Sequence, residues 1–574
     1  MRSLAASPFA VTRPAITRFV ITRFVITRLA VILFSGALLT EAACSGSDSG
    51  AAGAARTTRH EDLAPFFAEW RTFQKPKLVD GVPDYTATAM AAQYAALAGW
   101  RQRLAAFDTT HWTIAQQVDW QVVSAEMYGL DFDHRVLKPW ANNPAFYVTV
   151  FTEQSDQPAR EGPFVLGSLE LWTNAYPLSA ARAAEIKAGF RAIPKLLTQA
   201  RSNLTGTGKD LWTHGTASIK AQGKELESIA TTWERVAPEL VADVRAAQAA
   251  TDSFATWLDI QAPGKTGPSG IGVANYNWYL THVQLVPLTW QDEVTLMERE
   301  LARALASLRL EEERNRALPP QRPIASAAEH LRRFPAAVRD YMKFLQSRHI
   351  LTITPDLEPA LLARVGAFNA GPREFFTEVD YRDPTLMRTH GYHWFDLANM
   401  ANRPHPNPIR RGPLLYNIFN TRTEGNATGW EELMMHAGML DNRPRSRELV
   451  WILLAERAAR ALGDLHMQGN EFTLEQASQF ASDNTPRQWL RMSGNLVRFE
   501  QHLYLQQPGY GTSYIVGKID VERLIAERAR QLGDKFTMQA FSDEFNRAGL
   551  IPASLLRWEL TGSAPDVVRM LKAP

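Results

Sequence analysis

The segment from residue 383 to residue 440 is rich in side chains that can bind metals or transfer protons. After Asp383, with which it begins, it contains four histidines and four carboxylates: His390, His393, Asp396, His405, Glu424, Glu431, Glu432 and His436. A purely structural segment of this length usually holds fewer such groups, so this is where we look first for a functional site.

The spacing of these residues suggests how they could meet. His390, His393 and Asp396 follow one another at intervals of three residues. On one helix, each side chain would point about 60° around the helix axis from the previous one, close enough for two of them to share a metal ion. Glu424 and Glu431 are seven apart and would project in nearly the same direction. These residues could instead have purely structural roles. The two histidines could form a hydrogen-bonded pair, Asp396 could orient a histidine, and the glutamates could lie on a solvated helix face.

The elements that must position these residues are mainly helices. Apolar residues recur at helical spacing within 90–107, 294–308 and 521–532. The second stretch follows Thr289, with Asp292 three residues on, an arrangement that caps free N–H groups at a helix start. These patterns predict a mostly α-helical protein.

Strand-like segments are few and short. Phe146–Phe151, Ile350–Ile353 and Phe375–Tyr381 are rich in β-branched and aromatic residues. We therefore expect a large helical bundle with a small β-sheet near the candidate site. The body would span 61–574, and the proline-rich stretch 318–323 is a possible boundary between two lobes.

The N-terminus has the pattern of a bacterial export signal. The first 28 residues carry arginines and no acidic residue, and the apolar run 29–40 that follows is too short to span a bilayer. Cys44 stands where a lipoprotein signal ends, although Glu41 occupies a position where an aliphatic residue is usual. We predict a signal segment over 1–44 with lipidation at Cys44 and a flexible tether over 45–60; the alternative is simple cleavage after Ala43.

The charge balance and the cysteine count limit which classes of partner and which chemistry are possible. The net charge is +2, from 62 basic and 60 acidic residues, which gives no case for nucleic acid. Cys44 is the only cysteine, so an intramolecular disulfide is excluded and any chemistry must come from histidine, carboxylate and tyrosine. We expect an exported protein of the bacterial cell envelope, a periplasmic lipoprotein that contacts the membrane through its lipid anchor.

Two motifs resemble a known family. The stretch 423–433 (TEGNATGWEEL) is similar to the TEGWALYAEEL motif of the bacterial domain of unknown function 885 family, and 507–514 (QPGYGTSY) resembles its QPGQATSY segment. Looser similarities occur at 272–280 and 457–477. Together they extend over most of the chain from about residue 60.

The resemblance implies a helical zinc metallopeptidase of the gluzincin kind. Members carry HExxPGHH, followed by the glutamate of TEGW. On this basis Glu424 is the implied metal-binding glutamate, and Tyr514 falls on a tyrosine suited to stabilising an oxyanion.

The first of these motifs is incomplete here. Leu386 and Met387 occupy the positions of the leading histidine and of the glutamate that acts as general base, and neither can replace those residues in zinc binding or proton transfer. The remaining zinc site would be rebuilt from His390, His393 and Glu424, with Asp396 or Glu431 as base.

Three functional hypotheses remain open. The first is a metal-dependent hydrolase that resembles a peptidase and acts on a peptide or another small envelope substrate. The second is a non-catalytic lipoprotein that binds a ligand or peptide and descends from such an enzyme. The third, a carbohydrate enzyme, would use Glu424 with Glu431 or Glu432 as a carboxylate pair.

Overall fold

The computed structural model describes residues 59–572, and the predictions for Cys44, the signal segment and the tether before residue 59 lie outside them. The first helices are α1 (Leu63–Phe73), α2 (Ala87–Ala105) and α3 (Ile114–Phe132), with a hairpin of β1 (Leu78–Val79) and β2 (Val82–Pro83) between α1 and α2. A π-helical turn, η2 (Asp133–Leu137), and α4 (Pro139–Asn142) lead into the 3-10 turn η3 (Pro144–Tyr147). β3 (Val150–Phe151) then pairs in parallel with β4 (Leu169–Glu170).

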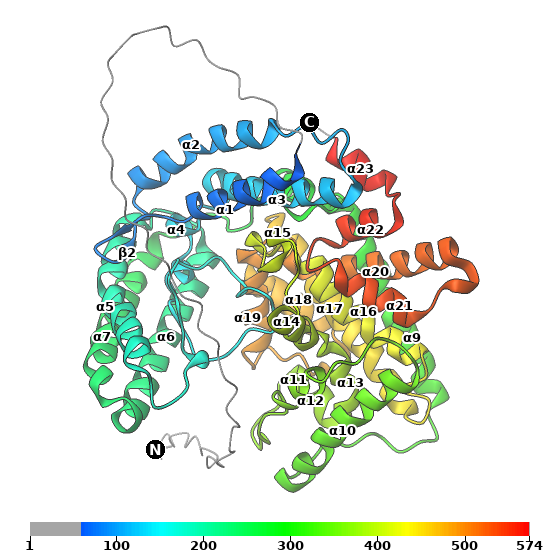
Figure 1. Ribbon diagram of the computed structural model, residues 1–574. Helices are drawn as coiled ribbons and strands as arrows, with labels where there is room; N and C mark the ends of the chain where they lie inside the picture. The colour runs from blue at the N-terminus through cyan, green and yellow to red at the C-terminus, as the bar shows by residue number, and fades with distance from the viewer. Residues whose placement is uncertain (1–58, 573–574) are drawn as a thin grey trace, which may run out of the picture. The chain divides into compact units, whose positions relative to one another are not determined.

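The next segment is a group of long helices, α5 (Ala180–Asn203), α6 (Lys209–Val236) and α7 (Val241–Gln261), which pack on one another at one side of Figure 1. The chain continues through α8 (Val273–Tyr279), the π-helical turn η7 (Leu280–Gln284), α9 (Trp290–Arg314), α10 (Ala327–Ser347), α11 (Leu357–Leu362) and α12 (Phe375–Arg382). α13 (Pro384–His390), α14 (Tyr392–Asn402), α15 (Pro408–Arg411) and the 3-10 turn η8 (Leu415–Asn417) complete this part.

The C-terminal third supplies the central helices α16 (Asn420–His436), α17 (Pro444–Gln468) and α20 (Tyr510–Leu532). Around them lie α18 (Leu474–Asn484), α19 (Leu496–Gln506), α21 (Met538–Arg547), α22 (Ala553–Thr561) and α23 (Pro565–Leu571). Every residue from Glu448 to Leu465 of α17 is buried, because α9, α18, α19 and α20 pack around it. The described residues thus form a mostly helical bundle with two small sheets, as the sequence predicts.

Some expectations need correction. Phe375–Tyr381 is not a strand but belongs to α12, where Phe375 and Val379 are buried at helical spacing. Ile350–Ile353 lies in a loop, and only Val150–Phe151 of the first predicted strand is extended. The capping box of Thr289 and Asp292 is present at the start of α9. Residues 318–323 lie in the loop between α9 and α10, and a division into lobes there stays a prediction.

No helix among the described residues is both long enough and apolar enough to cross a membrane.

The tightest helix crossing lies between α16 and α20. A Cβ atom added to Gly517 would lie 1.9 Å from the carbonyl oxygen of Thr421, and one added to Gly425 would lie 2.3 Å from the backbone of Gly517. Real Cβ atoms do not approach backbone so closely, so glycine at both positions lets the two helix backbones touch.

Because the helices are so close, adding a single methyl group at this crossing should destabilise the protein unusually strongly. Gly517→Ala should lower the free energy of unfolding by about 2 kcal/mol or more, because the helices must separate. Gly99→Ala is the matched control, since Gly99 lies in α2 with no atom within 4 Å of the added Cβ; it should stabilise by up to about 1 kcal/mol. Denaturant unfolding of both variants measures the difference, and equal effects would contradict the close crossing.

Candidate metal centre

Four helices and one loop bring the candidate site together. His390 ends α13, His393 lies in the first turn of α14, and Glu424 lies on α16. The histidines therefore lie on two helices separated at Gly391, and not on one helix as their spacing suggested. Their ring centroids are 5.0 Å apart.

The three predicted metal ligands converge. One ligand atom from each of His390, His393 and Glu424 lies within 4.8 Å of the others. His393 Nε2 lies 3.4 Å from Glu424 Oε2, close to the separation of about 3.3 Å that two ligands of a tetrahedral zinc ion have. His393 Nε2 is also buried without a hydrogen-bond partner.

Charges around the two histidines differ. Burial, then the guanidinium of Arg457, lowers the pKa of His390. Burial would also lower the pKa of His393, but the carboxylates of Glu424 and Asp156 outweigh it and raise this pKa to about 9. Burial would raise the pKa of Glu424, but His393 lowers it to about 2. His393 and Glu424 therefore form a buried ion pair when no metal ion replaces the imidazolium proton.

Glu431 orients His390 instead of facing solvent. Arg457 donates to both carboxylate oxygens of Glu431, each at 2.8 Å. His390 Nδ1 lies 3.1 Å from Glu431 Oε1 and 3.1 Å from Arg457 Nη2. Because Nδ1 is engaged, Nε2 is the His390 nitrogen available to an ion, as in carboxylate–histidine–metal arrangements.

Asp396 and Glu431, the two predicted general bases, are both held by arginines. Arg422 donates to both oxygens of Asp396, at 3.1 and 3.0 Å, as Arg457 does to Glu431. Burial outweighs Arg422 and raises the pKa of Asp396. For Glu431, burial is outweighed by Arg457 together with His390, which lower the pKa. In both residues the carboxylate oxygens that would accept a proton are occupied by a guanidinium. Glu432 is likewise paired, with Arg303 and Lys518.

Two residues that we did not predict complete the site. Tyr510, at the start of α20, donates its hydroxyl proton to Glu424 Oε1 at 2.6 Å. Gln157, in the loop between β3 and β4, donates to the same oxygen at 2.8 Å, and its amide nitrogen lies 3.3 Å from His393 Nδ1. Tyr510 stands four residues before Tyr514 in the QPG-like motif, whereas nothing in the sequence around Gln157 marks it.

Tyr514 lies beside the site, without a hydrogen bond that would aim its hydroxyl at the ligands. Its ring packs against Tyr510, 5.9 Å between centroids, and under the guanidinium of Arg460 at 5.3 Å. Of the two tyrosines, Tyr510 is thus the one whose hydroxyl contacts Glu424.

Glu161 is the remaining acid at the site. The Tyr510 hydroxyl lies 3.3 Å from Glu161 Oε1, and Ser155 donates to Oε2 at 2.8 Å. Burial, and then Asp156, raise the pKa of Glu161 to about 7. No arginine or lysine among the described residues pairs with it, so this carboxyl can gain or lose a proton near neutral pH.

Solvent can approach the site from the side of α12 and α13. A cavity of about 350 Å³ there is lined by residues that include His390, Asp156, Met387 and Trp394. Met387 thus borders this space with an apolar side chain, and Leu386 is fully buried in the core.

Part of the chain is similar in sequence to a known family. Residues 391–560 match the family described as "Bacterial protein of unknown function (DUF885)". The match includes His393, Glu424 and Tyr510 and begins one residue after His390. A search of curated proteins finds no match.

Solved structures share the fold. One is a candidate lipoprotein of unknown function from Shewanella oneidensis, with 13% identity, a TM-score of 0.63 and coverage of 87% of this chain and 97% of that one. Another is a candidate lipoprotein from Colwellia psychrerythraea, with 17% identity, a TM-score of 0.60 and coverage of 88% and 98%. At such identities the likeness concerns the fold alone.

Proposed function

We propose that this protein is a bacterial envelope lipoprotein that binds one divalent transition-metal ion, most suitably zinc, through His390, His393 and Glu424. The observation that carries the proposal is the convergence of three ligand atoms within 4.8 Å. Two imidazoles and one carboxylate are a donor set typical of zinc and leave room for a further ligand.

The surroundings support metal binding in two ways. His393 Nε2 has no hydrogen-bond partner, a cost that an ion would remove. Tyr510 and Gln157 both donate to Glu424 Oε1, which leaves Oε2, the oxygen nearest His393, for the ion. Hydrogen bonds of this kind hold a ligating carboxylate in place.

The envelope part of the proposal rests on the N-terminus. The basic segment, the short apolar run and Cys44 are the parts of a lipoprotein signal. The two solved structures of the same fold are themselves described as candidate lipoproteins.

Glu161 favours a second candidate function, hydrolysis of a peptide or another small envelope substrate. Zinc, when bound, supplies Lewis-acid activation of water. With Asp396 and Glu431 held by arginines, Glu161 is the carboxyl free to take the proton, and a pKa of about 7 suits a general base at neutral pH. Its contact with Tyr510, which also holds Glu424, places it beside the ligands.

If His390, His393 and Glu424 form a metal site, each protein molecule should bind one zinc ion. Purified protein should bind about one equivalent by elemental analysis and titration calorimetry, and His393→Gln and Glu424→Gln should each weaken binding by roughly tenfold or more. His436→Gln is the matched control, because His436 lies on α16 with its side chain 62% exposed. Wild-type protein without bound zinc at saturating concentrations would contradict the site and leave the His393–Glu424 ion pair as structural.

Hydrolysis is tested on zinc-loaded protein with an internally quenched random peptide library. The rate should rise with pH through about 7, because Glu161 acts as a base only when deprotonated. Glu161→Gln should reduce it by about a hundredfold or more, whereas Glu153→Gln, an exposed change in the same loop, should not. If zinc binds and the peptides stay intact, or if Glu161→Gln keeps the wild-type rate, the protein is a binder and not this hydrolase.

Lipidation is tested by expression of the full chain in a bacterium with radiolabelled palmitate. Wild-type protein should take up label and fractionate with membranes, and Cys44→Ala should do neither. Ser45→Ala, next to the cysteine, should behave as wild type. An unlabelled, soluble wild-type protein that begins at Cys44 would instead indicate simple cleavage after Ala43.

A further inference from the structure

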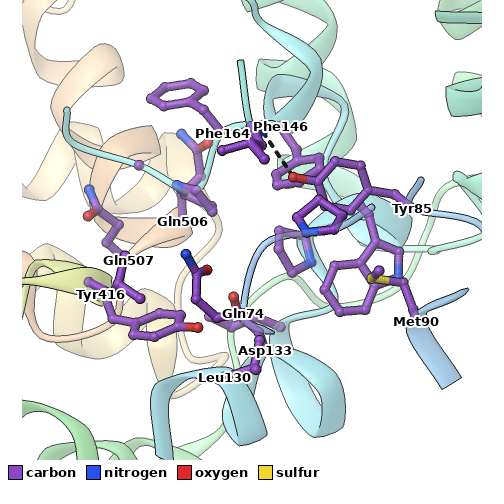
Figure 2. A pocket seen from close by; sticks show the side chains of 18 of the residues that line it. Gln74, Tyr85, Met90, Leu130, Asp133, Phe146, Phe164, Tyr416, Gln506 and Gln507 are labelled. Atoms are coloured by element: carbon purple, nitrogen blue, oxygen red, sulfur yellow. Dashed lines mark hydrogen bonds between the residues drawn. The ribbon is translucent and has the colours of Figure 1, made fainter. Parts of the chain in front are cut away.

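A second cavity, of about 280 Å³, lies on the other side of the loop that carries Gln157 and Glu161. Figure 2 shows Tyr416 on one side of it, Tyr85 and Met90 on the other, and Asp133 between them. Its walls come from the segment that follows α1, from α2, α3, η2, α4 and η3, from the end of α8, from η8, from the end of α19 and from Gly162 to Leu166 of the loop.

Asp133 is the only carboxyl among the residues that line this cavity, and it has no partner. No described residue forms a hydrogen bond or an ion pair with its carboxylate. Burial raises the pKa of Asp133 to about 8. An unpaired acid in such a place costs stability, so it calls for an explanation.

Aromatic rings surround this acid. Tyr85, Trp140, Phe146, Phe164, Tyr279 and Tyr416 all line the cavity. After the larger effect of burial, Asp133 raises the pKa of Tyr85, Tyr279 and Tyr416, so all three hydroxyls lie within its electrostatic reach.

The wall formed by Tyr416 is fixed in place. Its backbone has a φ of 58°, a left-handed conformation that is unusual for a residue other than glycine. Its ring lies on the backbone of α3 at Gly129, where an added Cβ would come within 2.2 Å of the ring. The cavity is therefore formed before any ligand arrives, which lowers the entropic cost of binding.

Several other polar groups in the cavity already have partners, whereas Gln507 Nε2, a donor, is buried without one. Asn417 donates to Gln507 at 2.7 Å, Asn143 donates to Gln506 at 2.8 Å, and the amide of Leu166 donates to the Tyr85 hydroxyl at 3.0 Å. Lys75 is the only cation in the lining, and it is exposed. Asp133 is thus the one strong acceptor that a ligand could satisfy.

We propose that this cavity is a binding site for an aromatic or aliphatic amine, whose ammonium group pairs with Asp133 inside the ring of aromatic side chains. Aromatic faces attract cations, and a partly buried carboxylate without a partner gains most from a cation that arrives with its own apolar body. The ligand is a small organic cation or a basic side chain of a peptide, since both present the same group.

The cavity and the metal centre share one loop but bind independently. Glu161 contacts Tyr510 at the metal centre, and the next residue, Gly162, lines the cavity. The proposal goes beyond metal binding and does not depend on it, because none of His390, His393 and Glu424 lines this cavity.

Titration calorimetry at pH 7.5 with phenethylamine and its neutral isostere phenethyl alcohol tests the site, with and without zinc. Wild-type protein should bind the amine more tightly than the alcohol. Asp133→Asn should weaken amine binding by about thirtyfold or more, as expected for loss of a buried charge partner, and leave alcohol binding unchanged. Lys75→Met should keep or strengthen amine binding, because it removes a like charge at the cavity.

Folding of the variant is checked by thermal unfolding. Asp133→Asn should melt at or above the wild-type temperature at pH 7.5, since ionisation of a buried, unpaired acid destabilises the folded state as pH rises. A folded Asp133→Asn protein with wild-type amine affinity would overturn the proposal. So would equal binding of amine and alcohol, or no amine binding, by wild-type protein. A basic hexapeptide that binds as the amine does would identify a peptide side chain as the ligand.

Discussion

The contact between Gly425 and Gly517 is the constraint on which the candidate site depends. Because neither residue has a side chain, α16 and α20 cross with their backbones touching. Glu424 is the neighbour of Gly425, so the crossing holds its carboxylate against the start of α20, where Tyr510 donates to it. A larger residue at either glycine would separate Glu424 from the tyrosine that orients it.

Buried charge is arranged around this crossing in matched pairs. Arg422 holds Asp396, and Arg457 holds Glu431; burial, and then the charge of Arg457, lowers the pKa of the nearby His390. Such pairs contribute little net stability, but removal of one partner costs several kcal/mol, so they fix one arrangement of the helices. They also bear on the chemistry, since Asp396 and Glu431 are committed to arginines. Glu161 has no such partner among the described residues, and burial raises its pKa to about 7.

The loop between β3 and β4 connects the two candidate binding sites. Its first part contributes Asp156, Gln157 and Glu161 to the candidate metal centre, and its next residues form a wall of the aromatic cavity. A short parallel pair of strands, Val150–Phe151 with Leu169–Glu170, fixes both ends of this loop. The small sheet near the site thus serves to position a loop and adds little to the core.

The sequence by itself determined the mostly helical class and the capped start of α9, because helical periodicity and capping residues are local properties. It also singled out His390 and His393 by residue type and Glu424 by resemblance to a family, and these three side chains do converge. It could not show that Gly391 separates the two histidines onto different helices, nor that Asp396 and Glu431 meet arginines. Those pairings join residues 26 positions apart, and Gln157 reaches Glu424 from 267 positions away. Only tertiary packing decides such contacts, and with them which carboxylate is free to act.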